Sequence, residues 1–392
     1  MKKVLILTIS TGQGHNQAAT SVGESFAKSG YQIIRHDFLA KNSKFLNDII
    51  VIGYELMASK FPNFYGWFYD LTNRPIVNSL LNIPFMHTKR KVSKLIHEIN
   101  PDVIVGTHAL STRIVSNLKK KGLQTPYILT VTDFKAHYTY ISSYVDAYIT
   151  GSDYTKKSLI EKNIDADKIY PIGIPIDKKF YIDVTHADDL KDDEYFNLLL
   201  MSGSFGLDTI FVVMKELLKN KHKLRITVVC GKNKHLKNTL TDYCNNNTFE
   251  NKKVHILGFT KDIPYLMDYC DIIVSKPGGL TVTESIVKNI PLIIPFSIPG
   301  QENENIDFLT SEGYSIKVNS IQDLNSEIDT LIENPDKLKS IKNKIQTLAD
   351  TYSLEKIVDI AESLIKKIKS DHHIIYGHFL YATFYYFLKI HL

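Results

Sequence analysis

The sequence from Ser275 to Ser285 reads S-K-P-G-G-L-T-V-T-E-S, and it follows an apolar run at 271–274 that is typical of a buried strand. Two glycines then let the backbone turn tightly, and residues 280–289 have a helical pattern. A strand, a glycine turn and a helix start form an anion site, because free N–H groups and the helix dipole point at the turn. Glu284 follows inside the helix, where it can reach a ribose beside a bound phosphate. The same pattern also fits an ordinary strand-to-helix connection.

A second polar cluster, P-G-Q-E-N-E-N from Pro299 to Asn305, follows another apolar strand at 291–296. Gln301 and Glu302 therefore lie at the carboxyl end of a strand, where open α/β sheets bind ligands. Two polar clusters on successive strand ends favour a ligand site over an ordinary turn.

The two motifs, S-K-P-G-G-L-T-x-x-E-S and P-G-Q-E-x-x-N, resemble the donor half of the diacylglycerol glycosyltransferases, which are the monogalactosyl- and processive glucosyl-diacylglycerol synthases. This family is related to the lipid-linked N-acetylglucosaminyltransferase of peptidoglycan synthesis. The resemblance covers most of residues 1–370 and leaves out 372–392. It implies an α/β protein of GT-B architecture, with two Rossmann-like doubly wound domains and a cleft between them. It also implies inverting transfer of a hexose from a UDP-sugar to 1,2-diacylglycerol.

The resemblance assigns the UDP-sugar to the second domain. Glu284 would hold the ribose, the glycine and serine turns would hold the phosphates, and the P-G-Q-E cluster would hold the sugar. After an apolar strand at 253–257, Phe259 would mark the uracil edge, although a core position suits it equally. The donor residues implied in this way are Gly14, Ser202, Gly203, Ser204, Gly206, Phe259, Thr260, Pro277, Gly278, Gly279, Leu280, Thr281, Glu284, Gln301, Glu302 and Asn305. Ser202 replaces the first glycine of the related G-G-S-x-G loop.

Two residues are candidates for the catalytic base that an inverting transfer needs near the acceptor hydroxyl. Asp133 follows the strand at 127–132, and the family has V-T-D-F at this place. His15 lies in Gly12-Gln13-Gly14-His15, which matches the family's G-x-G-H, and it would contact the donor phosphate or take the acceptor proton. Asp133 is the first choice and His15 the second. The alternative for both is capping or packing at the start of a turn or helix.

His108 and His137 also follow strands of the first half, and we expect them to contact acceptor or phosphate. Trp67 lies in an aromatic segment, residues 45–86, which is followed by the basic run H-T-K-R-K-V-S-K at 87–94. Aromatic rings beside cations suit a membrane interface that presents a lipid acceptor. A pair of core helices with an exposed lysine face would produce the same pattern.

Length and composition predict a globular protein of two domains, because 392 residues exceed one ordinary core and 44% of them are hydrophobic. The alternation of strands and helices occurs in two blocks, joined by a Pro- and Gly-containing, then acidic, stretch at 171–195. The boundaries that follow are an acceptor and membrane domain at 1–180, a UDP-sugar domain at 181–350, a helix at 351–370 that crosses back, and an aromatic tail at 371–392.

Charge is unevenly distributed along the chain. Residues 1–185 carry 23 Lys and Arg against 15 Asp and Glu, a net +8, whereas the whole chain carries +5. A basic first half suggests attraction to an anionic membrane surface, with a solvated lysine-rich face as the alternative. We expect no nucleic-acid partner, because no nucleic-acid module and no Arg cluster occurs.

The remaining features concern location and cofactors. Cys230, Cys244 and Cys270 have neither metal-ligand nor disulfide spacing, which favours a reducing compartment and packing roles. The apolar run at 4–9 leads into glycines and is interpreted as a first strand rather than a signal sequence. No metal-binding spacing is present, so we expect no metal and no cofactor besides the UDP-sugar substrate. The expected location is peripheral, on the cytoplasmic face of a membrane.

The tail and three rival functions stay open. Residues 374–388 carry no Asp, Glu, Lys or Arg and many aromatic rings, which suits either a packed terminal helix or an interfacial anchor. The rivals are a transferase with a different acceptor, such as a polyprenyl-linked sugar, or a UDP-glucuronate donor; a UDP-sugar 2-epimerase; and a non-catalytic UDP-sugar sensor. The sequence identifies neither the hexose nor the processivity.

Overall fold

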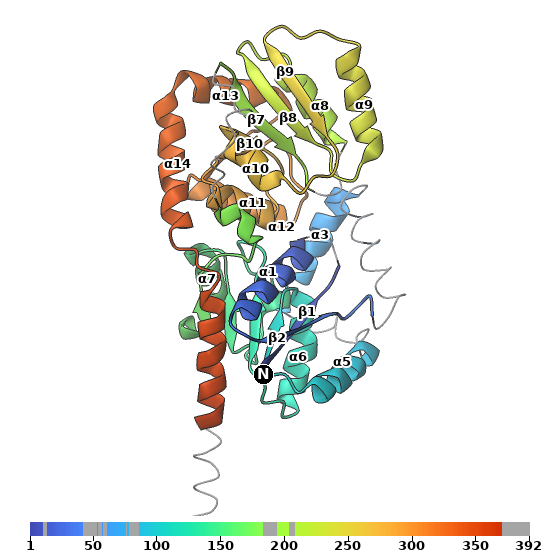
Figure 1. The fold of residues 1–392 in the computed structure, drawn as a ribbon, viewed down its shortest axis with the longest axis vertical. Coiled ribbons are helices and arrows are strands. Elements are labelled where there is room, and N and C mark those ends of the chain that lie inside the picture. Colours follow the sequence, from blue (N-terminus) through green and yellow to red (C-terminus); the bar gives the residue numbers. More distant parts are fainter. Residues whose placement is uncertain are drawn as a thin grey trace, which may run out of the picture.

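The structure is a computed structural model of the chain that describes residues 1–10, 14–41, 53, 57, 61–75, 77, 86–182, 194–203 and 208–370. Two parallel six-stranded sheets lie one above the other, each accompanied by helices (Figure 1). This arrangement confirms the predicted α/β class with two doubly wound sheets. The tail at 371–392 and the loop residues Ser204 and Gly206 lie outside the described residues.

The first sheet has the strand order β2-β1-β3-β4-β5-β6. Its strands are β1 (Lys3–Thr8), β2 (Gln32–Asp37), β3 (Val103–Gly106), β4 (Tyr127–Thr130), β5 (Ala147–Ile149) and β6 (Ile169–Tyr170). The helices of this half are α1 (Gly14–Lys28), α3 (Pro62–Thr72), α5 (Met86–Ile99), α6 (Ala109–Lys120) and α7 (Asp153–Ile160). Alternate residues of β1 enter different cores, with Leu5 and Leu7 on one face and Val4 and Ile6 on the other. Both faces of the sheet are therefore covered, as the apolar composition of β1 predicts.

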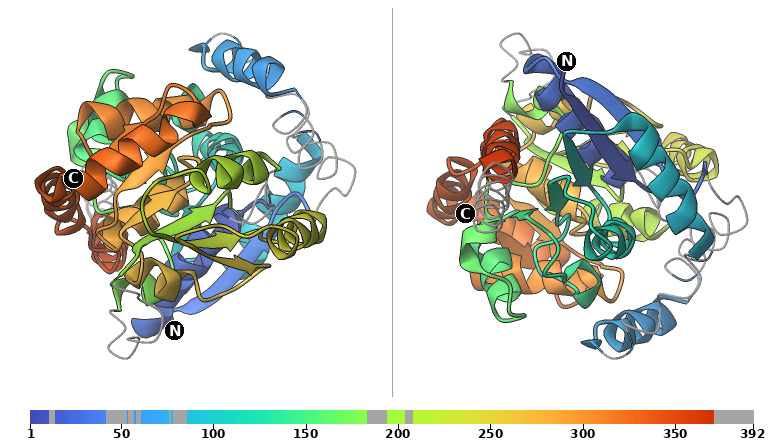
Figure 2. Two further views of the ribbon diagram at one scale, coloured as in Figure 1. Left: turned by 90° about the horizontal axis from the view of Figure 1, so that it is seen from above. Right: turned by 90° about the horizontal axis from the view of Figure 1, so that it is seen from below.

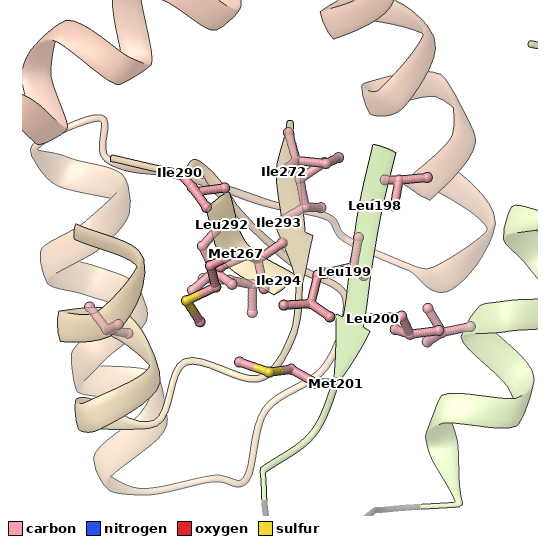
Figure 3. Close-up of a cluster of buried hydrophobic side chains, with 14 of the residues drawn as sticks. Leu198, Leu199, Leu200, Met201, Met267, Ile272, Ile290, Leu292, Ile293 and Ile294 are labelled. Carbon is pink, nitrogen blue, oxygen red and sulfur yellow. The ribbon is translucent and has the colours of Figure 1, made fainter. Parts of the chain in front are cut away.

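The second sheet has the strand order β12-β11-β10-β7-β8-β9. Its strands are β7 (Phe196–Met201), β8 (Leu224–Val229), β9 (Lys252–Leu257), β10 (Ile272–Val274), β11 (Leu292–Ile294) and β12 (Ser315–Lys317). The helices are α8 (Thr209–Leu217), α9 (Lys234–Asn245), α10 (Ile263–Asp268), α11 (Gly279–Val287), α12 (Gln301–Ser311), α13 (Leu324–Glu333) and α14 (Pro335–Ala349). Buried side chains of β7, β10 and β11 form the centre of this half (Figure 3).

Strand order reverses once in each sheet, between β1 and β3 in the first and between β7 and β10 in the second. Open α/β sheets bind ligands outside the carboxyl ends of the strands at such a switch point. His15 and Thr107 follow β1 and β3, and Gly203 and Lys276 follow β7 and β10. The topology thus places the predicted motifs at the two switch points.

The end of the described chain returns to the first sheet. Residues 356–370 form a helix whose Ile357, Ala361 and Ile365 pack in the same core as Val4 and Ile6. Its Glu362 pairs with the Lys2 ammonium group and accepts a 2.5 Å hydrogen bond from the Tyr31 hydroxyl. Figure 1 shows this helix beside the first sheet, after α14 has run along the second.

Replacing Ile357 by Ala is expected to lower the free energy of unfolding by about 2–5 kcal/mol, because the side chain is fully buried and its loss leaves a cavity. Urea denaturation followed by circular dichroism measures the change. Lys367→Ala, on the exposed face of the same helix, is the control and should change stability by less than about 0.5 kcal/mol. Equal effects of the two substitutions would contradict the packing of this helix on the first sheet.

Candidate active site between the two sheets

His15 lies at the start of α1, in the first turn of the helix. Its Nδ1 is 2.8 Å from the Thr107 carbonyl oxygen, which can only accept, so Nδ1 carries the proton and Nε2 is left as an acceptor. Burial lowers the pKa of His15, which keeps the imidazole neutral at neutral pH. The ring lies edge-on to that of His108, with 4.4 Å between centroids. His15 can therefore accept a proton at Nε2.

Asp133 follows β4 and keeps partial exposure. One carboxyl oxygen accepts a 3.3 Å hydrogen bond from the Tyr140 hydroxyl, which gives the group a fixed orientation. Burial, with the nearby negative charge of Glu304, raises the pKa of Asp133 to about 7. A carboxylate with a pKa near neutrality is suited to act as a general base.

The glycine turn after β10 lies against the Asp133 loop. A methyl group at Gly279 would lie 1.9 Å from the carbonyl oxygen of Thr132, so only glycine permits this approach. The first turn of α11, which carries the anion site predicted from the sequence, therefore meets the loop that carries the predicted base. The sequence predicts glycine here for approach to a ligand, and the structure adds a contact between the two halves of the protein.

Asn305 of α12 joins the two halves by its side-chain amide. Its Oδ1 accepts from the Phe134 backbone N–H at 2.9 Å, and its Nδ2 donates to the Pro277 carbonyl at 2.9 Å. The rings of Phe134 and Phe308 are stacked beside it, with 4.5 Å between centroids. Asn305 is fully buried and satisfied by protein groups, so the structure gives it partners other than the donor contacts predicted for it.

Glu302 and Lys276 form an ion pair at the carboxyl ends of β10 and β11. The second carboxylate oxygen of Glu302 accepts from the Ile298 N–H at 2.7 Å, and the residue is 1% exposed. Lys276 lies between two glycine turns: methyl groups at Gly278 and Gly203 would lie 3.4 Å from its Nζ and 3.8 Å from its Cε. The structure thus adds to the site a cation, Lys276, which belongs to the S-K-P-G-G motif but has no role predicted from the sequence.

Glu284 of α11 faces α1 of the other half. Its Oε1 accepts a 3.2 Å hydrogen bond from the Gln17 side chain, and burial raises the pKa of Glu284 to about 8. A methyl group at Gly14 would lie 3.4 Å from Leu280, so the starts of α1 and α11 are in contact. Gln17, which sequence reasoning missed, is therefore a partner of the predicted ribose ligand.

The other predicted donor residues lie around these groups. Ser202 is buried after β7, and Gly203 follows it with a positive φ of 81°, a conformation that favours glycine. Phe259 is 56% exposed after β9, which excludes the core position, and the Thr260 hydroxyl donates to Asp262 at 3.0 Å. Gln301 accepts a 2.5 Å hydrogen bond from the Tyr65 hydroxyl. Pro277 precedes the glycine turn, and Thr281 lies in the first turn of α11.

The lower-ranked residues of the first half have separate environments. His108 caps α6, with Nδ1 accepting from the Leu110 N–H at 3.1 Å, and burial holds its pKa well below the usual range. His137 is buried, and its Nε2 is 3.1 Å from the Tyr69 carbonyl oxygen. Trp67 is 58% exposed on α3. His108 thus lies beside His15, whereas His137 supports α3.

The described residues contain neither a candidate metal site nor a helix suited to span a membrane. No group of three or more His, Cys, Asp or Glu side chains in these parts of the chain could hold a metal ion. Over the same residues, no helix combines the length and apolar character needed to cross a membrane.

Family models match both halves of the chain. Residues 15–176 match the model of monogalactosyldiacylglycerol (MGDG) synthase, and residues 188–348 match that of glycosyl transferases group 1. The chain is 30% identical to a processive diacylglycerol beta-glucosyltransferase of Staphylococcus aureus over 322 residues, which cover 80% of each chain. It is 29% identical to a protein of the same name from Bacillus subtilis over 369 residues, 91% of this chain and 94% of the relative.

Solved structures share the fold at low sequence identity. MurG of Acinetobacter baumannii superposes with a TM-score of 0.63 at 14% identity and covers 93% of this chain and 100% of its own. HepE of Anabaena in complex with UDP-glucose gives a TM-score of 0.56 at 14% identity, covering 94% of this chain and 100% of its own. A UDP-GlcNAc 2-epimerase from Neisseria meningitidis gives a TM-score of 0.56 at 13% identity, covering 92% of this chain and 99% of its own. These likenesses confirm the GT-B architecture.

Proposed function

The chain belongs to the family of processive diacylglycerol beta-glucosyltransferases, and from this premise we propose that it transfers a hexose from a UDP-sugar to 1,2-diacylglycerol. The acceptor hydroxyl oxygen attacks the anomeric carbon, the bond from that carbon to UDP breaks, and the hydroxyl proton passes to a base of the protein. One observation carries the assignment of the site: the Asp133 loop touches the glycine turn that opens α11. This contact supports the proposal that Asp133 and the start of α11 act on the same substrate.

Asp133 is the proposed base. Its pKa of about 7 leaves a large ionised fraction at neutral pH, and the Tyr140 hydroxyl orients the carboxylate. His15 is the second candidate, because its Nε2 can accept a proton, or it can hold the donor phosphate once protonated. Inverting transfer requires such a base on the side of the sugar opposite the leaving UDP.

Protein groups are proposed to stabilise the departing UDP. The first N–H groups of α11 face the glycine turn, and the Lys276 ammonium group lies between this turn and Gly203. Preorganised donors and a cation are suited to the negative charge that develops on the leaving diphosphate. Glu284 would then bind the ribose by exchanging the Gln17 amide for sugar hydroxyls. The proposal needs no metal ion.

We place the reaction at a membrane surface, on its cytoplasmic face. The first 185 residues carry a net charge of +8, and exposed aromatic rings of α3 lie in the same half. Cations attract a protein to anionic lipid, and aromatic rings are suited to the headgroup region. The relatives named above transfer glucose, so UDP-glucose is the first donor to test, followed by UDP-galactose and UDP-glucuronate.

The test is UDP release from this panel of UDP-sugars, with and without diacylglycerol in anionic vesicles, with thin-layer analysis of the lipids. The proposal expects a new glycolipid and UDP release that depends on diacylglycerol. Release of UDP and free sugar without lipid would point to the epimerase. A release that requires a different lipid would change the acceptor, and binding without any release would point to the sensor.

The pH dependence should identify the base. Because a carboxyl group is mainly protonated below its pKa, and that of Asp133 is raised to about 7, kcat/KM is expected to fall as the pH drops below about 7, approaching tenfold per pH unit. Tyr140→Phe removes the hydrogen bond that stabilises the carboxylate, so it should move the inflection to higher pH. A profile without an acid limb, or one that Tyr140→Phe leaves in place, would contradict Asp133 as the base.

A further inference from the structure

Helix α3 exposes one aromatic face. Phe61, at its N-cap, is 57% exposed, Phe64 is 54% exposed and Trp67 is 58% exposed; Phe68 is exposed to a smaller extent. These positions recur at helical spacing and therefore share one side of the helix. We call them the outer face of α3. Large exposed apolar groups gathered on one face indicate a contact surface rather than scattered surface residues.

An adjacent side of α3 contacts the second half of the protein, at the start of α12. The Tyr65 hydroxyl donates to Gln301 Oε1 at 2.5 Å, and the Tyr69 hydroxyl donates to Glu304 Oε2 at 2.6 Å. Gly66 lets the helix approach closely, since a methyl group there would lie 2.7 Å from the Pro299 Cβ. We call Tyr65 and Tyr69 the inner face.

The end of α3 is held by the loop that also carries Asp133. The Thr139 N–H donates to His137 Nδ1 at 3.1 Å, so Nε2 carries the proton and donates to the Tyr69 carbonyl oxygen at 3.1 Å. Asn73 Oδ1 accepts from the Tyr138 N–H at 2.9 Å. Helix α3 therefore bridges the loop of the proposed base and the helix that carries Gln301.

We propose that α3 couples the membrane to the donor site: its outer face inserts into the headgroup region of an anionic bilayer, and its inner face then holds α12 in the position seen here. This inference rests on the proposed function, because it takes the donor to be a UDP-sugar bound in the second half. It goes beyond that function by making donor affinity depend on lipid.

Charge and chemistry favour a bilayer as the occupant of the outer face. Arg74, two residues after the end of α3, is exposed, and Arg90 and Lys91 are exposed on α5. Both helices lie to the right of the centre in Figure 1, and Figure 2 shows them at neighbouring edges of the molecule. Amphipathic rings flanked by cations are the composition of an interfacial helix on anionic lipid.

Coupling follows because both faces belong to one short helix. A bilayer that binds α3 in its bridging position stabilises the contacts with Gln301 and Glu304, and through them the position of α12. A ligand that binds preferentially when α12 is in this position must then bind more tightly in the presence of lipid, and lipid must bind more tightly in the presence of that ligand, by the same factor.

The chain carries its own probe for this test, because Trp67 is its single tryptophan. Insertion of the outer face into vesicles of phosphatidylcholine and phosphatidylglycerol, without diacylglycerol, is expected to shift the Trp67 emission to shorter wavelength. In the same vesicles the Kd of UDP is expected to fall about 5- to 150-fold, with an equal gain in vesicle affinity when UDP is present. Phosphatidylcholine vesicles alone should have a weaker effect.

Two variants separate the faces. Tyr65→Phe/Tyr69→Phe removes only the two hydroxyls of the inner face, so it should keep the emission shift and lose the effect of vesicles on UDP affinity. Phe61→Ser/Phe64→Ser should lose both the shift and the coupling and keep the UDP affinity measured without vesicles.

The inference is overturned if vesicles leave the UDP affinity of the unmodified protein unchanged, or if the tyrosine variant keeps the coupling. It is also overturned if Trp67 does not shift and sedimentation shows instead a dimer that Phe61→Ser/Phe64→Ser dissociates. Failure to bind UDP under any condition would contradict the proposed function itself, which separates the two outcomes.

Discussion

Replacing Asp133 by Asn is expected to lower kcat about 10²- to 10⁴-fold, because the amide cannot take the proton of the acceptor hydroxyl. The substitution keeps the shape of the side chain, and its carbonyl oxygen can still accept from the Tyr140 hydroxyl. The Kd of UDP should therefore stay within a factor of about two, well below the tenfold that 1.4 kcal/mol represents. Initial rates of UDP release with saturating diacylglycerol, together with calorimetric titration of UDP, measure the two quantities.

The same substitution is expected to stabilise the folded protein at neutral pH although it lowers the activity. Because the pKa of Asp133 is raised in the folded protein, the group favours folding when protonated and loses that contribution as the pH rises toward about 7. At pH values above this, Asp133→Asn should raise the Tm, which excludes misfolding as the cause of lost activity. His15→Gln is the companion variant: a large loss there, with full activity in Asp133→Asn, would transfer the role of base to His15.

Replacing Gly279 by Ala is expected to lower kcat/KM at least about 10²-fold, as misplacement of reacting groups by about 1 Å does. The new methyl group would lie 1.9 Å from the Thr132 carbonyl oxygen, and both atoms belong to backbone segments that cannot rotate away. The start of α11 must therefore move from the Asp133 loop, which separates the proposed anion site from the proposed base. Steady-state kinetics with varied UDP-sugar give the loss.

Gly23→Ala is the matched control for this substitution. It adds the same methyl group to a buried glycine of α1, where the nearest atoms are side-chain methyl carbons of Ile33 and Ile6 at 3.3 and 3.4 Å. These can adjust by a few tenths of an ångström, so we expect activity close to that of the unmodified protein. Full activity in Gly279→Ala would mean that the contact between Gly279 and Thr132 is absent from the catalytic arrangement.

Most strands of the two sheets could be predicted from local sequence patterns, because burial of a strand requires apolar residues at neighbouring positions. The strands β1, β3, β7 and β10 are buried on both faces of their sheets. Such strands consist of nearly uninterrupted apolar residues, so they can be identified in the sequence. The strand β12 was not predicted, because its three residues Ser315–Lys317 contain a single apolar side chain and take strand geometry from pairing with β11. The helix predicted from Leu280 begins one residue earlier, at Gly279.

The site was predicted as a set of motifs but not as a set of contacts. Asp133, His15 and Glu284 follow from strand ends and from family motifs. The partners Gln17 and Tyr140 do not, because neither residue is part of a quoted motif. The role of Gln17 depends on where two distant segments meet, and that of Tyr140 on how the loop after β4 folds back on Asp133. Asn305 shows the converse, since a motif position expected at the sugar instead links Phe134 to Pro277. Contacts between residues far apart in sequence are fixed by packing of the two halves.

The return of the chain to the first sheet has a consequence for synthesis. The core that contains Val4 and Ile6 is completed by Ile357 and Ile365, near the end of the described chain. Because a ribosome releases the amino-terminal strands first, the part of that face which α1 does not cover stays exposed until the whole second half has been made. During this interval its apolar residues are available to chaperones and to aggregation. A chain interrupted before residue 356 can therefore complete the second domain but leaves the first one open, and quality control can recognise it by that exposed face.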